Sequence, residues 1–519
     1  MKSLSTLCLL LLFTYSSFSQ KIKVQWGEDL KMDKEDVIDK VISFDDNFIY
    51  LQTQTIHTAK FGIVSADNLQ NTIPCIIKLD KNLKEVERKE FKTQEDKMKF
   101  LGIVALGNGF VLITDKENKA DKKLDFFITR IDKNLNILGQ PSHIWSYSTD
   151  RCNISWEYCL SPDSSLMLFT GRYLNQKSSE SKKLLFKVFD WELNTVFEKD
   201  ITFNSTAENM DISSTVVSNT GDVFACGIKR EDNSKKKQDE KFDLVMFKYS
   251  TKGSEREIPI KINDRQVNYT KLKMDKASKN IYLLSTYQTL EFNGESGYLV
   301  SKVDASTGDL LFNSLNDFDI SFIQKVNDMN DDKTKSKGPG ISGSTKIIDL
   351  EIVDGKGIYA TLEKTYQEFQ DLGNGVRYWI YYYQSIISIK TDSTGKQDYI
   401  KLIPKNQYFS SSVSNLSCFL FCSSGSSNIL YNETEKNINY SLTSEDRPKR
   451  FNESKEMYLM LVEINDKGNM KKSAILKPED AKVSYYIRDF HRIGENEILI
   501  WGYDSKNKSY KLAKGVFEN

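Results

Sequence analysis

The feature that most constrains this chain is a short unit that recurs along it. The unit is an apolar run, an Asp, a tight turn and a second run punctuated by apolar residues, as in Cys75–Phe91. The Asp that ends the first run recurs at Asp80, Asp132, Asp190, Asp304 and Asp392. Recurrence of one unit along a whole chain indicates a repeat architecture.

The composition of the unit predicts a β-hairpin. Its first run is short and rich in Ile, Val and Phe, which is typical of a strand covered on both faces. An Asp at the strand end can accept hydrogen bonds from the backbone that follows and so start a turn. We expect Gly, or Asn82 and Asn134 where Gly is missing, to take the left-handed turn position. These Asp residues are therefore expected to be structural.

A third strand signal precedes each hairpin, usually after a tight turn such as Gly107-Asn108-Gly109, and a fourth lies before that turn. Four antiparallel strands per repeat are typical of a β-propeller blade. We call these strands A to D in chain order. The sequence predicts an all-β fold with eight blades, which begin near Val37, Phe100, Ile154, Ile212, Val267, Ile347, Asn415 and Tyr485. The alternative is seven blades with an irregular segment around 405–456, where strand A is poorly marked.

Both ends of the repeat region lack a partner. The last blade reaches strand C at Lys511–Phe517 and has no strand D, whereas Ile22–Leu30 precedes blade 1 and reads as a lone strand D. If the N-terminal strand closes the ring, it supplies the missing strand D of the last blade, gains a pairing partner itself and covers an exposed sheet edge. We expect Trp26 to be buried between blades 8 and 1.

The first residues resemble an export signal. Residues 1–19 combine a basic start, an apolar segment at Leu7–Phe13 and the small-x-small site Ser17-Phe18-Ser19. The apolar segment is far shorter than the ~20 residues of a membrane helix, and no other stretch could span a bilayer. We therefore expect a mature chain of residues 20–519 that is one propeller domain, exported to the periplasm or the extracellular space.

The charge balance bears on the class of partner, and the cysteine content bears on disulfide formation. Lys and Arg together number 72, as do Asp and Glu, so no basic excess points to nucleic acid. Six of the seven Cys would remain after signal removal, in a compartment that permits disulfides. Cys418 and Cys422, if on one strand, would lie too far apart to bond, so we expect small core residues there. The sequence indicates neither the pairing of the other cysteines nor an oligomeric state.

Connection lengths predict one decorated face. The A–B and C–D turns are short, whereas several B–C and D–A connections are long, and these emerge together on one face of a propeller. The segments Gln367–Arg377, Glu433–Glu456 and Asp317–Ser344 belong to blades 5 to 7 and should form a raised sector. Insertions on one face of a repeat fold usually mark its binding side.

The densest aromatic run of the chain lies beside this sector, and its candidate binding residues are Arg377, Tyr378, Trp379 and Tyr381. Such a run at the start of strand C could form a stacking platform for a sugar or a peptide. The alternative is an ordinary strand, since aromatics are favoured there. We expect the residues to stand at the base of the sector.

Metal and catalytic motifs are weak. Asp328, Asn330 and Asp332 have the spacing of a calcium loop, but Lys333 and Pro339 replace its Gly and Glu, so we expect a polar loop and no metal. The three His fit no zinc or triad pattern. No phosphate-loop, dinucleotide or nucleophile-elbow motif occurs, and we expect no cofactor.

One hairpin, Lys302–Phe312, resembles the repeat of quinoprotein-type propellers, which are often eight-bladed. The resemblance implies a propeller; it lacks the family's Trp and therefore implies no quinone. We expect a non-catalytic binding or scaffold module that recognises a protein or glycan with its decorated face. The alternative is a hydrolase or lyase with carboxylates around the central channel. A propeller fold is compatible with both a binding module and an enzyme, so the fold alone does not distinguish them.

Overall fold

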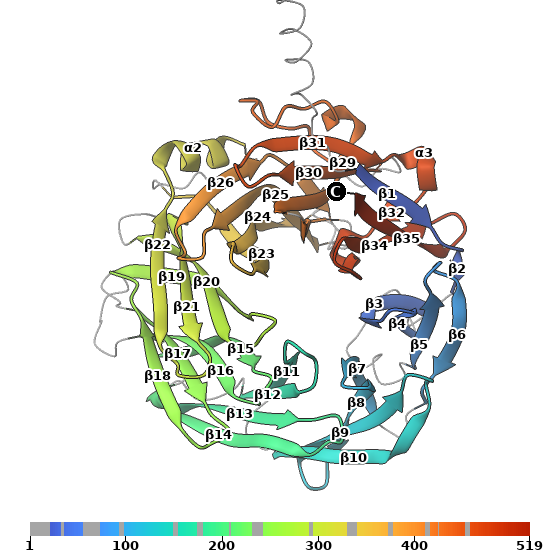
Figure 1. Ribbon diagram of the computed structural model, residues 1–519, viewed down its shortest axis with the longest axis vertical. Coiled ribbons are helices and arrows are strands. Elements are labelled where there is room, and N and C mark those ends of the chain that lie inside the picture. Colours follow the sequence, from blue (N-terminus) through green and yellow to red (C-terminus); the bar gives the residue numbers. More distant parts are fainter. Residues whose placement is uncertain are drawn as a thin grey trace, which may run out of the picture.

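A computed structural model of the chain describes residues 21–32, 36–55, 73–92, 98–148, 154–173, 180–206, 209–230, 242–289, 294–329, 340–371, 377–409, 416–423, 425–451 and 457–518. Eight antiparallel sheets are arranged in a ring, with the first strand of each blade nearest the centre (Figure 1). This confirms the predicted eight-bladed β-propeller, and the seven-bladed alternative is wrong.

The first four blades each contain four strands in the order A to D. Blade 1 comprises β3 (Asp36–Phe44), β4 (Phe48–Thr55), β5 (Pro74–Asp80) and β6 (Glu85–Glu90). Blade 2 comprises β7 (Lys99–Leu106), β8 (Gly109–Asn118), β9 (Lys123–Asp132) and β10 (Ile137–Ser148). Blade 3 comprises β11 (Ile154–Leu160), β12 (Met167–Tyr173), β13 (Ser181–Phe189) and β14 (Thr195–Thr206). Blade 4 comprises β15 (Met210–Val217), β16 (Val223–Arg230), β17 (Phe242–Tyr249) and β18 (Glu255–Ile260).

The other four blades carry the irregular elements. Blade 5 comprises β19 (Arg265–Met274), β20 (Asn280–Thr289), β21 (Gly297–Asp304) and β22 (Leu310–Asp317), followed by α2 (Ile320–Asp328). Blade 6 comprises β23 (Ser344–Val353), β24 (Gly357–Asp371), β25 (Arg377–Thr391) and β26 (Gln397–Ile403), with the short β27 (Gln407–Phe409). Blade 7 comprises β28 (Phe419–Ser423), β29 (Ser426–Thr434), β30 (Met457–Ile464) and β31 (Met470–Leu476), with η3 (Glu435–Asn437) after β29. Blade 8 follows α3 (Pro478–Ala481) and comprises β32 (Ser484–Tyr485), η4 (Ile487–Asp489), β33 (His491–Arg492), β34 (Glu497–Asp504) and β35 (Ser509–Glu518).

The N-terminal strand closes the ring, as predicted. β1 (Lys21–Trp26) pairs antiparallel with β35, from Lys21 opposite Glu518 to Trp26 opposite Ala513, and β2 (Leu30–Lys31) pairs with the start of β35. Trp26 packs against the core cluster at this junction. We expected its side chain to be buried, but it is only half-buried. It lies on the outermost strand of the blade, which is covered less completely than an inner strand.

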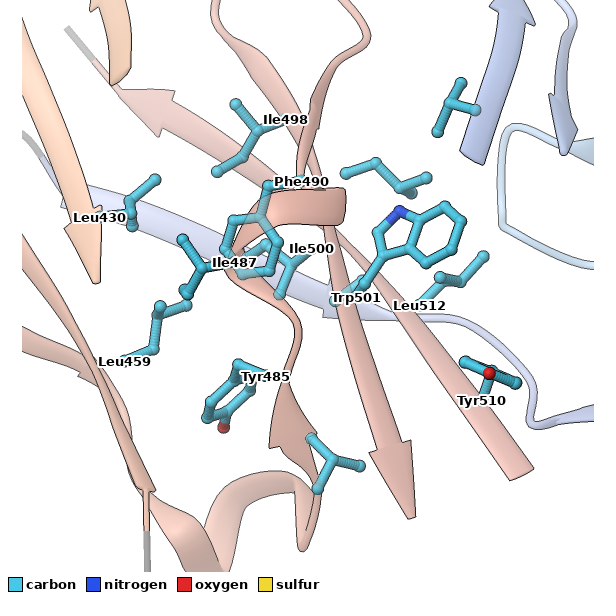
Figure 2. Packing of buried hydrophobic residues seen from close by; sticks show 14 of the residues in the cluster. Leu430, Leu459, Tyr485, Ile487, Phe490, Ile498, Ile500, Trp501, Tyr510 and Leu512 are labelled. Atoms are coloured by element: carbon cyan, nitrogen blue, oxygen red, sulfur yellow. The ribbon is translucent and has the colours of Figure 1, made fainter. Parts of the chain in front are cut away.

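The largest core cluster joins blades 7, 8 and 1. Figure 2 shows Trp501 and Ile500 of β34 in this cluster, together with Ile487 and Phe490 of the η4 segment. Trp501 is fully buried. Apolar side chains between blades hold neighbouring sheets together, because each sheet alone leaves two faces uncovered.

The repeated Asp residues occupy equivalent C–D turns. Asp80, Asp304 and Asp392 each accept two backbone hydrogen bonds from the turn residues that follow. Asp132 and Asp190 each accept one backbone hydrogen bond, from the Asn four residues on. Hydrogen bonds from the Ser306 hydroxyl and the Thr307 backbone lower the pKa of Asp304. The turn Asp residues thus hold the hairpins together.

One detail of these turns was predicted wrongly. The left-handed residues are Leu83 (φ 62°) and Leu135 (φ 57°), and not Asn82 and Asn134. Both leucines are buried, at 2% and 0% exposure. A non-glycine residue in this conformation costs about 1 kcal/mol or more, which burial of a Leu side chain offsets.

The described cysteines Cys75, Cys159, Cys226, Cys418 and Cys422 are all free thiols. Cys418 and Cys422 lie in or beside β28 and are buried, as expected of small core residues. Within the described ranges, no helix is long and apolar enough to cross a membrane.

Candidate functional site

The candidate site is the long hairpin of blade 6. β24 and β25 each contain 15 residues, whereas the outer strand β26 contains 7. Pairing of β24 with β25 continues as far as Asp371 opposite Arg377. Most of the segment Gln367–Arg377, which we predicted as a loop, is therefore strand. The hairpin extends past its blade on the side from which B–C connections emerge.

One face of this hairpin carries an exposed aromatic pair. Phe369 lies directly opposite Trp379, and their ring centroids are 4.9 Å apart with an interplanar angle of 58°. Phe369 is 46% exposed and Trp379 is 44% exposed. Few large apolar side chains of the described residues keep this much surface in water, and here two lie side by side. Such a pair is typical of a contact surface and not of a core.

The predicted site residues are only partly brought together. Trp379 lies near the far end of the hairpin and not at the base of the sector, because β24 and β25 are longer than expected. Tyr381 is half-buried and packs against the core cluster of blades 7, 8 and 1. Arg377 and Tyr378 are the first residues of β25, but their side chains lie outside the described part of the structure.

A second group of aromatics braces the hairpin. The rings of Tyr366 and Tyr382 stack at 4.1 Å with an interplanar angle of 8°, and Tyr408 of β27 lies 6.0 Å from Tyr382. The Tyr382 hydroxyl donates a 3.0 Å hydrogen bond to Glu368. The Arg450 guanidinium lies 5.2 Å from the Tyr408 ring centroid. This stacking gives the hairpin a rigid support.

Sequence reasoning missed Phe369, Tyr366 and Tyr408. The signal for the first two was present, since residues 365–371 alternate between two sides of a strand and include Thr, Tyr and Phe. The Gln, Glu and Asp residues between them made the segment look like a loop. Tyr408 follows an irregular stretch that carries no repeat signal.

The B–C connection of blade 7 contacts the segment at the end of α2 and the segment beside β27, and β27 pairs with β25 of the hairpin. The Tyr440 hydroxyl of the B–C connection of blade 7 lies 3.6 Å from Met329 Sδ, just after α2, and Arg447 donates to the Asp328 carbonyl. Phe451 of that connection donates a 2.8 Å backbone hydrogen bond to Asn406 beside β27. Figure 1 shows α2 near β22 and β26, at the rim of the ring. We call the β24–β25 hairpin, α2 and residues 438–451 the raised sector.

A buried polar network fixes the root of the hairpin. Lys405 forms an ion pair with Glu363 of β24, and both side chains are fully buried. The Ser417 hydroxyl donates to Glu363 at 2.6 Å, and Lys405 donates to Gln407 at 2.9 Å. The Gln407 amide in turn donates to the Asn432 carbonyl of blade 7 at 2.7 Å. A buried ion pair satisfied by further hydrogen bonds fixes geometry more than it adds stability.

Carboxylates along the inner strands are largely neutralised. Lys271 lies 3.5 Å from Asp349, Lys273 lies 3.1 Å from Glu351, and Arg172 lies 2.5 Å from Glu157. Asp39 of β3 and Asp489 of η4 form no such ion pair within the described residues, and Asp39 accepts a hydrogen bond from Gln52 instead. Burial raises the pKa of Asp489 to about 6, the nearby carboxylate of Asp39 adds to the shift, and Arg488 opposes it.

The structure contains no assembled metal site within its described residues. Asp328 is the last residue of α2, while Asn330 and Asp332 lie outside the described part. No group of three or more His, Cys, Asp or Glu side chains is placed to hold an ion among the residues that the structure describes.

No protein-family model and no curated protein matches this sequence. Among solved structures, the chain is similar to the β-propeller domain of the trilobed protease of Pyrococcus furiosus, with 10% identity, a TM-score of 0.35 and coverage of 86% of this chain and 97% of that one. It is similar to an acylaminoacyl peptidase of Pyrococcus horikoshii, with 10% identity, a TM-score of 0.32 and coverage of 79% and 58%. It is also similar to a protein of unknown function from Dyadobacter fermentans, with 8% identity, a TM-score of 0.32 and coverage of 95% and 99%. The fold assignment rests on the eight sheets themselves.

Proposed function

We propose that this protein is an exported, non-catalytic binding module that recognises a partner macromolecule with its raised sector. The observation that carries the proposal is the exposed pair Phe369 and Trp379 on a braced hairpin. Aromatic side chains supply most of the energy at many protein interfaces, because they bury large areas and lose few rotamers. A rigid support reduces the ordering cost of binding.

The shape of the pair favours a protein partner over a glycan. A sugar ring stacks on one flat aromatic face, whereas the rings of Phe369 and Trp379 are tilted by 58° to each other and present no single plane. Exposed aromatic side chains of this kind pack against apolar side chains of a protein partner.

A hydrolase or lyase is the second candidate, and Asp489 is the observation that favours it. A carboxylic acid whose pKa is raised to about 6 can donate a proton near neutral pH, and Arg488 lies beside it to hold an anionic group. The ion pairs on Glu157, Asp349 and Glu351 weigh against this candidate. Turnover of ester, glycoside or uronide substrates that disappears in a folded Asp489→Asn variant would support it.

Export is part of the proposal and rests on residues 1–19, which lie outside the described residues. Expression of the full chain in a Gram-negative host tests it directly. Mass spectrometry of the periplasmic fraction should find a mature chain that begins at Gln20. An uncleaved chain that remains in the cytoplasm would contradict export.

Site-specific photocrosslinking tests the binding face. A photoreactive phenylalanine analogue at position 379 should capture a defined partner in the source cell envelope, and the same analogue at position 467 on the opposite face serves as the matched control. Protease and glycosidase treatment of the adduct distinguishes a protein from a glycan. Equal capture from both positions, or capture only from 467, would overturn the proposal.

A further inference from the structure

A cavity of about 440 Å³ opens between the inner strands of blades 6, 7 and 8. Its walls come from β23, from residues 417–420 at the start of β28 and from the η4 segment. The inner wall recedes here because β28 has 5 residues where β23 has 10, and because η4 divides strand A of blade 8 into β32 and β33. A cavity of this size falls in the range that holds small molecules.

Two cations line this cavity from different blades. Lys346 comes from β23 and Arg488 from η4, and neither lies within 4.0 Å of a carboxylate of the described residues. Arg488 is held in place, since it donates to the Tyr383 hydroxyl and its guanidinium lies 4.8 Å from the centroid of that ring. A positioned guanidinium matches the geometry of a carboxylate.

The acidic residues near the cavity do not cancel this charge. Asp349 is the one acid in the lining, and its carboxylate lies 3.5 Å from Lys271 and accepts the backbone N–H of Leu350. Glu363, behind Ser417, is neutralised by Lys405. Asp489 follows Arg488 in the chain and interacts with its charge, but it is not part of the lining. The lining residues therefore carry more positive than negative charge.

The rest of the lining is mainly apolar. Phe419 and Phe490 meet edge to face with ring centroids 6.0 Å apart, and Ile347 and Ile348 line the side that β23 forms. Phe419 and Ile348 are only half-buried, so they offer surface to a ligand. Apolar walls with a few convergent polar groups are typical of small-molecule sites.

We propose that this cavity binds a small organic carboxylate. Its anionic group binds Arg488, Lys346 adds favourable charge, and its apolar body lies against Phe419 and Ile348. A neutral ligand loses the charge-assisted hydrogen bonds, and a cationic one meets repulsion. The site lies between the inner strands of blades 6, 7 and 8 and uses neither Phe369 nor Trp379, so it goes beyond the binding role proposed for the raised sector.

Ligand-observed fluorine NMR tests this site with two probes of the same shape, a fluorinated phenylacetate and its neutral amide. The acid should bind saturably, and the amide at least about tenfold more weakly. Lys346→Gln and Arg488→Gln should each weaken binding of the acid by about tenfold and leave the amide unchanged. Lys467→Gln, in a C–D turn of the opposite face, is the control and should bind as the parent does.

Arg488→Gln also removes the contact with Tyr383 and could therefore change the local structure. The Lys346→Gln variant tests the charge without this effect, because Lys346 is exposed and its replacement should not affect folding. Thermal melts of all variants check the fold. Equal affinities for acid and amide, an unchanged affinity in both variants, or no saturable binding of either probe would overturn the proposal.

Discussion

Phe369 and Trp379 face each other across the β24–β25 hairpin, with ring centroids 4.9 Å apart. Their mutual contact leaves 46% and 44% of these side chains exposed. Burial of exposed aromatic surface stabilises a complex, at roughly 25 cal/mol for each Å² removed from water. The pair thus offers exposed aromatic surface whose burial would stabilise a complex.

Ring closure predicts a large stability effect. Deletion of residues 20–31 removes β1 and β2, which leaves the edge of β35 unpaired and uncovers part of the core cluster of blades 7, 8 and 1. The midpoint of thermal unfolding should fall by many degrees relative to a chain that starts at residue 20. A midpoint within about two degrees of that control would rule out a stabilising closure.

The turn Asp residues should matter for stability and not for binding. Asp304→Ala removes the backbone hydrogen bonds to Ser306 and Thr307 and should cost on the order of 1 kcal/mol in the free energy of unfolding. Urea titration measures this cost. If the variant lost partner binding while its unfolding curve stayed in place, the residue would belong to a site and not to the scaffold.

Asp115 of β8 predicts a pH dependence of stability. Burial raises its pKa to about 6, with Glu117 adding to the shift and Lys99 opposing it. Its ordinary value is 3.8, so between that value and pH 6 the folded chain keeps a proton that the unfolded chain releases. The contribution of this group to stability is therefore complete at low pH and is lost as pH rises through about 6.

Asp115→Asn mimics the protonated form and should remove that loss. The variant should be more stable than the parent at pH 8, by up to about 3 kcal/mol, and should match it near pH 3. Urea titrations at the two pH values give the comparison. A gain at low pH alone would show that the sign of the pKa shift is wrong.

The sequence predicted the repeat because its signals are local. Apolar runs followed by Asp and a turn, at Asp80 or Asp392, define hairpins without knowledge of the rest of the chain. Closure was also predictable, since a lone strand at one end and an incomplete blade at the other leave one simple pairing. Leu83 and Leu135 were missed as turn residues because their burial, which offsets backbone strain, depends on tertiary packing.

The site was less predictable for a related reason. Trp379 stood out as part of an aromatic run, but its partner Phe369 lies in a segment whose polar residues suggested a loop. The length of the hairpin depends on support from Tyr408 and on the buried Lys405–Glu363 pair. These contacts join residues far apart in sequence, so no local pattern shows them.

The affinity of one double variant tests most directly whether the raised sector binds the partner. Isothermal titration of the crosslinked partner, once purified, should give at least about 30-fold weaker binding for Phe369→Ala with Trp379→Ala, which corresponds to about 2 kcal/mol. Lys252→Ala and Lys467→Ala, in turns of the opposite face, should bind as the parent does. Full affinity in the double variant, or loss of binding in the two lysine variants, would contradict binding by the raised sector.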